Sequence, residues 1–111
     1  MLNLDSVKRQ IATALDAAPR PLRVMLFGSF ARGAPHEDSD IDLVVILNKE
    51  GRSDTYKAMI SARMDIAKRL RRLRRKYPID VLVYTKEEWE DLKASGSSFI
   101  TKIEQEGVAV L

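Results

Sequence analysis

The sequence contains no cysteine among its 111 residues, which excludes a disulfide framework, a thiolate zinc site and a cysteine nucleophile. Its longest uninterrupted apolar run lies around Leu43–Leu47 and is far too short to span a membrane. The N-terminus carries Asp5, Lys8 and Arg9 within its apolar pattern, which is not typical of a signal peptide. These absences predict a cytoplasmic protein that does not enter the membrane.

What is present is an ordinary globular composition with an uneven charge distribution. Hydrophobic residues make up 45% of the chain and charged residues 32%, and the length predicts a single domain over residues 1–111. The net charge is +3, but it is concentrated in one basic cluster, without which the rest of the chain would be slightly acidic. The basic cluster consists of Lys68, Arg69, Arg71, Arg72, Arg74, Arg75 and Lys76.

Apolar residues at helical spacing predict four main helices. The first covers residues 4–17, with Asp5 or Ser6 as its N-cap and two prolines after it. The second is a long helix over residues 53–77, capped by Ser53 or Asp54 and ended by Pro78. Two short helices follow, over residues 86–94 and from residue 97 or 98 to 106. Residues 29–32 predict an additional brief helical turn.

Three apolar segments predict strands, over residues 23–27, 41–47 and 79–85. In the second of these, Ile41, Leu43 and Val45 would point to one face and Val44 and Ile46 to the other. A strand that is apolar on both faces is covered on both faces. The sequence therefore predicts an α/β domain in which helices flank a short sheet of three main strands.

Acidic residues stand at the start of two of these strands. Asp40 and Asp42 are spaced i, i+2, so their side chains would share a face, and Asp80 has the same position in the third strand. If the two strands are neighbours, the three carboxylates converge. Each like-charged pair at roughly 5 Å then costs about 3 kcal/mol at an effective dielectric near 20. Divalent cations remove this repulsion, and oxygen ligands favour Mg²⁺ or Mn²⁺.

Gly28 and Ser29 stand where the first strand turns into a helical turn. Glycine allows the backbone to approach a ligand closely, and backbone N–H groups at such a turn favour an anion, typically phosphate. An anion site beside metal-binding carboxylates predicts phosphoryl or nucleotidyl transfer, for which two metal ions would stabilise the attacking and leaving oxygens.

The combination of Gly28-Ser29, ten intervening residues, Asp40-x-Asp42 and the later Asp80 resembles the DNA-polymerase-β-type nucleotidyltransferase superfamily. The segments "GSFARG…SDIDLVV" and, at the C-terminus, "SFITKIEQEGVAVL" resemble sequences of its minimal nucleotidyltransferase (MNT) branch. The resemblance implies a nucleotidyltransferase fold with a short mixed sheet. It also implies a Mg²⁺-dependent enzyme, with two ions, that uses ATP or another NTP. In this branch the usual role is that of the antitoxin partner of a HEPN toxin, which is inactivated by AMP transfer to a tyrosine.

Carried onto this chain, the resemblance implies that Gly28 and Ser29 hold the terminal phosphates. Asp40 and Asp42 would bind both metals, and Asp80 would complete one metal site and help to deprotonate the acceptor hydroxyl. Arg32 is a further candidate for phosphate contact. The length leaves no room for an acceptor-binding domain, so the acceptor is expected to be a partner macromolecule and the protein to form an oligomer with its toxin.

Two other functions compete with this one. The chain could be a non-enzymatic antitoxin that only binds its toxin, although the intact acidic and Gly-Ser residues argue against that. It could also be a transferase for a small molecule such as an antibiotic. The basic cluster is either a solvated helix face or a docking surface for an acidic partner or for RNA. Because no aromatic platform accompanies it, independent nucleic-acid binding is not expected.

Overall fold

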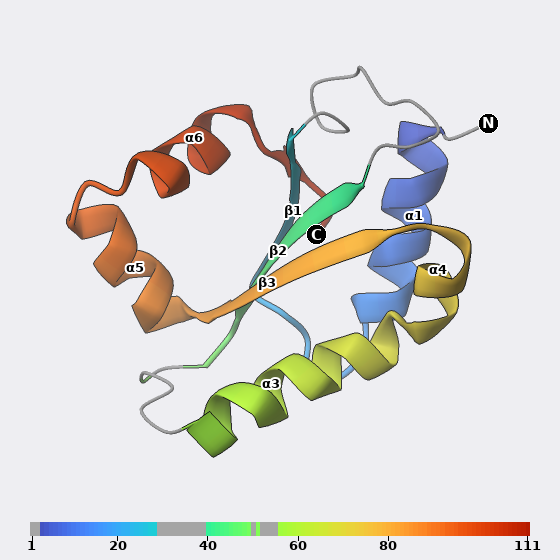
Figure 1. Cartoon of the computed structure of the whole chain (residues 1–111), viewed down its shortest axis with the longest axis horizontal. Helices are drawn as coiled ribbons and strands as arrows, with labels where there is room; N and C mark the ends of the chain where they lie inside the picture. The colour runs from blue at the N-terminus through green and yellow to red at the C-terminus, as the bar shows by residue number, and fades with distance from the viewer. Residues whose placement is uncertain (1–2, 29–39, 50, 52–55) are drawn as a thin grey trace.

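The computed structural model of the chain describes residues 3–28, 40–49, 51 and 56–111. Its helices are α1 (Leu4–Leu15), α3 (Tyr56–Arg69), α4 (Arg71–Lys76), α5 (Lys86–Ala94) and α6 (Ser98–Glu106). Its strands are β1 (Arg23–Phe27), β2 (Ile41–Leu47), β3 (Ile79–Thr85) and β4 (Val108–Ala109). The described strands form one mixed sheet with helices on both faces, as Figure 1 shows, so the predicted α/β fold is confirmed.

The strand order is β3-β2-β1-β4. β2 pairs with β3 in parallel, and β1 pairs antiparallel with both β2 and β4. The fourth strand was not predicted from the sequence. It is only two residues long and adds to the free edge of β1, with Val108 opposite Leu26 and Ala109 opposite Met25. Such a short segment becomes a strand through tertiary pairing and not through its own propensity.

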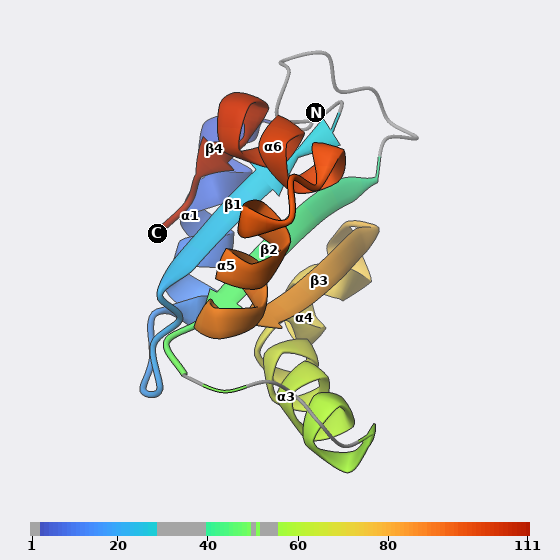
Figure 2. The same cartoon turned by 90° about the vertical axis from the view of Figure 1, so that its left-hand side faces the viewer.

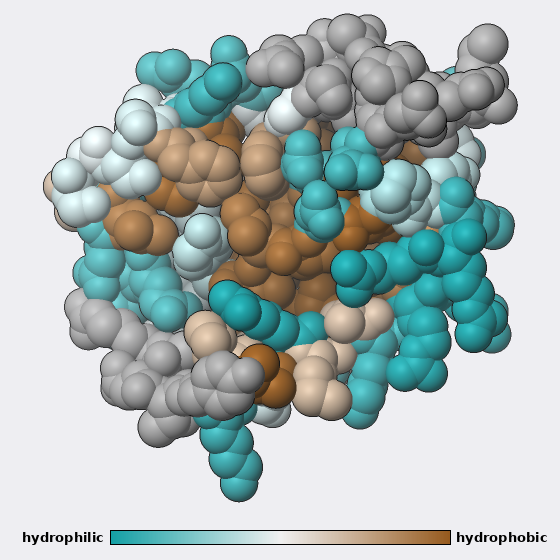
Figure 3. Space-filling view, viewed as in Figure 1, coloured by the Kyte–Doolittle hydropathy of each residue, from teal (hydrophilic) through white to brown (hydrophobic). Residues whose placement is uncertain are grey.

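The two faces of the sheet carry separate apolar layers. Ile41, Leu43 and Val45 of β2 pack with residues from α1, α3 and α4. Val44 and Ile46 point the other way and pack with residues from α5 and α6. The predicted alternation of β2 is therefore confirmed, and Figure 2 shows the sheet between the two helical layers. Figure 3 shows apolar residues gathered in the middle of the molecule, with hydrophilic residues around them.

The first helix begins and ends slightly differently from the prediction. Its N-cap is Asn3, whose side-chain oxygen accepts a hydrogen bond from the Ser6 backbone N–H at 3.1 Å, so the expected caps Asp5 and Ser6 lie inside the helix. Asn3 is as good a cap as either, and starting at Leu4 adds a residue to the helix. The helix ends at Leu15 rather than residue 17, because Asp16 leaves the helical conformation.

The long helix predicted over residues 53–77 is divided in two. Leu70, with φ −94° and ψ 2°, separates α3 from α4, while the predicted caps Ser53 and Asp54 lie outside the described residues. Leu70 is fully buried and Leu73 is 7% exposed. Both side chains belong to the core cluster on this face of the sheet. Because residues three positions apart also share a face in a continuous helix, the periodicity does not reveal the interruption at Leu70.

The two C-terminal helices follow the prediction closely. Thr85 caps α5 in a reciprocal capping box with Glu88, and Ser97 caps α6. Trp89 of α5 is 2% exposed and donates its indole N–H to Glu104 at 2.9 Å, so it lies in the core between α5, α6 and the sheet. None of the helices within the described residues combines the length and the apolar character needed to cross a bilayer.

Candidate functional site

The predicted acidic residues lie at one end of the sheet. Asp42, near the start of β2, is in register with Asp80 of β3 on one side and with Phe27 of β1 on the other. Asp40 immediately precedes β2, and Gly28 immediately follows β1. The strands that carry Asp42 and Asp80 are therefore neighbours, which is the condition under which the sequence predicts that the carboxylates converge.

These acids face the layer formed by α5 and α6. Side chains alternate along a strand, so Asp42 shares its face with Val44 and Ile46, which pack against that layer. Asp80 shares the face through its register with Asp42. Asp42 is half-buried, whereas Asp40 and Asp80 are exposed. A ligand can therefore reach Asp80 from solvent, while Asp42 lies deeper.

Gly28 is packed directly against the Asp42 carboxylate. Its φ of +77° lies in the left-handed region, which glycine adopts without strain. A Cβ placed on Gly28 would come within 2.5 Å of Oδ2 of Asp42, which is too close for any side chain. The backbone conformation therefore favours glycine here, and any side chain would have to displace the Asp42 carboxylate. The close approach places a backbone turn beside the acid that the sequence predicts to bind metal.

The electrostatics of this end of the sheet are unfavourable to Asp42. Burial raises the pKa of the Asp42 carboxyl, and the neighbouring charges of Asp80 and Asp40 raise that pKa further. Within the described part of the chain, none of the three acids forms an ion pair. The ionised form of Asp42 therefore lowers the stability of this end of the sheet. A bound cation would offset the repulsion between these carboxylates.

The three acids do not form a closed ligand set in this conformation. Among residues 3–28, 40–49, 51 and 56–111, no group of three or more acidic or histidine side chains is arranged to hold a metal ion. The donor set nevertheless fits a hard cation, because all its atoms are carboxylate oxygens.

A cleft of about 380 Å³ opens beside Gly28 and Asp42. Its other wall is a face of α6, which sequence analysis did not connect with the site. The helical spacing of residues 99, 102, 103 and 106 shows that they share a face, but only the packing of α6 on the sheet shows that this face reaches Asp42. The lining residues are Phe27, Gly28, Asp42, Phe99, Lys102, Ile103 and Glu106.

A second cavity of about 410 Å³ lies beyond the opposite end of β2. Of the predicted site residues that the structure describes, none lines this cavity, so the candidate site is assigned to the cleft beside Gly28 and Asp42. Its lining residues are Pro19, Arg20, Leu47, Asn48, Lys49, Ala58, Ser61, Ala62 and Asp65. The predicted phosphate contacts Ser29 and Arg32, and the single histidine His36, lie outside the described residues.

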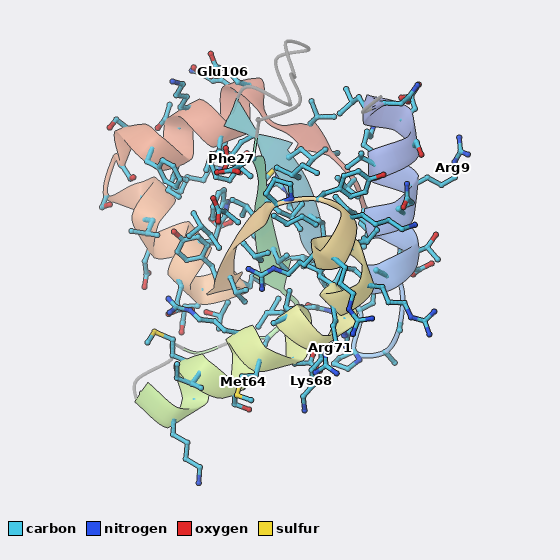
Figure 4. All side chains as sticks on the ribbon, turned by 45° about the vertical axis from the view of Figure 1, so that its right-hand side comes forward. Arg9, Phe27, Met64, Lys68, Arg71 and Glu106 are labelled. Atoms are coloured by element: carbon cyan, nitrogen blue, oxygen red, sulfur yellow. The ribbon has the colours of Figure 1, made fainter. Side chains whose placement is uncertain are left out.

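The basic cluster lies on α3 and α4, the two helices that precede β3 in the chain. Figure 4 shows Lys68 and Arg71 beside Met64, far from Phe27 and Glu106 at the other end of the molecule. Two of its members bind within the chain. Arg69 lies 3.3 Å from Asp65 and donates to the Ala17 carbonyl at 3.0 Å, and Arg74 donates to the Ile79 carbonyl at 3.1 Å. The remaining members, Lys68, Arg71, Arg72, Arg75 and Lys76, are exposed.

Comparison with protein families identifies the chain. The family described as "Polymerase beta, Nucleotidyltransferase" matches residues 9–109, which is almost the whole sequence. The chain belongs to the polymerase β nucleotidyltransferase family. The family predicted from Gly28, Ser29, Asp40, Asp42 and Asp80 is thereby confirmed, and so is its nature as a nucleotidyltransferase. Comparison with curated proteins gave no match.

Solved structures share the fold of this nucleotidyltransferase. A putative nucleotidyltransferase from Sulfolobus solfataricus is 18% identical, with a TM-score of 0.57 over 96% of this chain and 77% of the other. A toxin-antitoxin solved with AMP-PNP is 19% identical, with a TM-score of 0.57 over 99% of this chain and 73% of the other. A mutant of the toxin-antitoxin MntA-HpeT, in which two aspartates two positions apart are replaced by glutamate, is 16% identical, with a TM-score of 0.54 over the same shares, 99% and 73%.

Proposed function

We propose that this nucleotidyltransferase transfers AMP from ATP to a hydroxyl group of a partner HEPN-type toxin, a tyrosine in particular, and acts as the antitoxin of the pair. The observation that carries the proposal is the juxtaposition of Asp42, Asp80 and Gly28. Two register-paired carboxylates and a close backbone turn meet at one end of the sheet in a chain of the polymerase β family. The MNT-type resemblance and the fold shared with two toxin-antitoxin structures support the antitoxin setting.

In this proposal Asp40, Asp42 and Asp80 would hold Mg²⁺. Bound there, the metal would neutralise the clustered carboxylates and the charge of the triphosphate. Burial, followed by the charges of Asp80 and Asp40, raises the pKa of Asp42, and a bound cation would favour the ionised carboxylate against all three. The spacing of Asp40 and Asp42 also equals that of the two aspartates altered in the MntA-HpeT mutant.

Residues of the chain itself would bind the phosphates and accept the proton. Gly28 and Ser29 would bind the terminal phosphates through the backbone turn after β1. Asp80, being exposed, would accept the proton from the incoming hydroxyl. The acceptor oxygen then forms a bond to the α-phosphorus, the bond from that phosphorus to the bridging oxygen breaks, and pyrophosphate leaves with the electron pair.

The decisive test is the intact mass of a HEPN-type helical protein encoded beside this chain, after incubation with the chain, ATP and Mg²⁺. We expect a gain of one or more AMP units, located on tyrosine by peptide mapping. Asp42→Ala should abolish the gain, whereas Asp5→Ala, which removes an exposed acid on α1, should leave it unchanged. A tight complex without any mass gain would instead identify a binding-only antitoxin.

The basic cluster is proposed to dock the partner rather than to bind the nucleotide. Charge reversal at Arg71, Arg72 and Arg75 should weaken partner binding while ATP binding stays unchanged, because these side chains are exposed and are not among the described residues that line the cleft beside Asp42. The same partner affinity before and after charge reversal would mean that the cluster is a solvated helix face.

A further inference from the structure

The α6 wall of the cleft beside Gly28 and Asp42 carries an exposed aromatic ring. Ile100 and Ile103 anchor α6 on the sheet and are almost fully buried, whereas Phe99 remains 43% exposed. Three other large apolar side chains are similarly exposed in the described part of the chain, and none of them is aromatic: Leu22, Met64 and Leu82. An exposed ring at the mouth of a charged cleft is a feature that core packing does not explain.

The Phe99 ring is held in place from one side. It meets Phe27 edge-to-face, with the ring centroids 5.6 Å apart and the planes at 88°. Phe27 is in register with Asp42, so this contact ties the exposed ring to the strand that adjoins the acids. A fixed aromatic ring with free surface is suited to stacking on a nucleobase, because every base has a π-face.

A cation lies one helical turn from that ring. Lys102 follows Phe99 at i+3, so the two share a face of α6, and both line the cleft with Glu106. Figure 4 shows Glu106 and Phe27 at the same end of the molecule. Among the described residues that line the cleft, Lys102 is the one cation, and Asp42 and Glu106 are the acids. A polyanionic ligand that enters beside Asp42 therefore meets Lys102.

We propose that α6 forms the nucleoside side of the nucleotide site, with Phe99 packing against the base and Lys102 contacting the phosphate chain. This inference rests on the proposed function, which places a nucleoside triphosphate at Gly28 and Asp42. The cleft volume, about 380 Å³, lies within the range of small-molecule sites. Since stacking does not read hydrogen-bonding edges, this wall favours purines over pyrimidines through stacking area and discriminates little between ATP and GTP.

The test measures binding without any acceptor, by calorimetry with Mg²⁺. Two probes are compared: an ATP analogue with a methylene group between the α- and β-phosphorus atoms, and inorganic tripolyphosphate. Phe99→Ala and Phe99→Leu should each weaken analogue binding about 10-fold and leave tripolyphosphate binding unchanged. Phe99→Tyr should restore analogue binding, because it keeps the ring.

Lys102→Met should weaken both probes about 3- to 10-fold, with a loss that shrinks as salt is added. Lys68→Met removes an exposed cation on the other side of the sheet and should change neither affinity. Thermal unfolding of each variant controls for the fold.

Three results would overturn the inference while leaving the proposed function in place. The first is analogue affinity unchanged in Phe99→Ala and Phe99→Leu, and the second is an equal loss of tripolyphosphate binding in these variants. The third is intact analogue binding with a loss only of transfer to the partner, which would assign the ring to the acceptor. If the unaltered chain binds neither probe, the proposed function itself fails.

Discussion

Replacing Gly28 with alanine isolates the contact that ties the turn after β1 to the Asp42 carboxylate. The new Cβ would stand 2.5 Å from Oδ2 of Asp42, roughly 1 Å closer than an ordinary non-bonded contact. A φ of +77° also costs an alanine about 1–2 kcal/mol. Because Oδ2 is the far end of a side chain, it can swing away at modest cost to the fold. We therefore expect Gly28→Ala to lower the free energy of unfolding by about 1–2 kcal/mol, close to the backbone cost alone.

Gly96 offers a matched control. Its φ is +78°, nearly that of Gly28, but a Cβ there would meet nothing within 4 Å. Gly96→Ala should therefore cost about the same 1–2 kcal/mol in urea or thermal unfolding. Only Gly28→Ala should weaken binding of the Mg²⁺–ATP analogue, by about 10- to 100-fold, because only this variant displaces a carboxylate proposed to bind metal.

A double variant shows whether Gly28→Ala weakens analogue binding through Asp42 or independently of Asp42. If the effect passes through Asp42, adding Gly28→Ala to Asp42→Ala should change analogue binding by less than about threefold. Fully additive losses, or unchanged binding in Gly28→Ala alone, would refute the argument that the position of the Asp42 carboxylate requires glycine at residue 28.

Three further predictions concern stability, each measured by chemical denaturation. Asp42→Asn should stabilise the metal-free chain by up to about 1 kcal/mol at neutral pH, because it removes repulsion from Asp80 that solvent partly screens. The pKa of Asp42 is raised in the folded state, so stability of the unaltered chain should rise as pH falls through that pKa; a flat profile there would contradict the shift. Glu104→Ala should cost about 1–3 kcal/mol, because it removes the partner of Arg23 and leaves the buried Trp89 N–H unpaired, whereas Glu104→Gln should cost less. Hydrogen bonding from Arg23 lowers the pKa of Glu104, so its contribution should be present above about pH 4.5 and lost as pH falls through the lower folded pKa. Thr85→Ala should cost about 1–2 kcal/mol, since it removes both the α5 cap and a hydrogen bond to the Gly51 carbonyl; no loss would mean that water replaces both.

The elements that were predicted correctly depend on local signals. β2 and β3 have the predicted bounds because their apolar runs are bordered by acids or proline on one side and by polar residues on the other. The capping box of Thr85 and Glu88 is encoded within four residues. Two predictions were wrong: the α1 cap and the unbroken helix over residues 53–77. In both cases the local pattern allows alternatives of similar energy, so periodicity and cap preference could not choose between them.

The residues of the candidate site could be predicted from local sequence, but their arrangement in space could not. The residue types and the spacing of Gly28, Ser29, Asp40, Asp42 and Asp80 were enough to predict the family, because this pattern lies within one chain and needs no knowledge of the fold. Asp42 lies beside Asp80 because β2 and β3 are neighbouring strands. From the sequence, this could be predicted only on the assumption that the two strands pair.

The sequence by itself therefore determined the α/β class, the two-faced burial of β2 and the acids available to the site. The tertiary structure alone decided that these acids face the α5–α6 layer, that Gly28 abuts Asp42, and that Phe99 and Lys102 line the same cleft. The physical reason is that periodicity specifies which residues share a face within an element. Which faces meet depends on the packing of α6 and on the pairing of strands far apart in the chain.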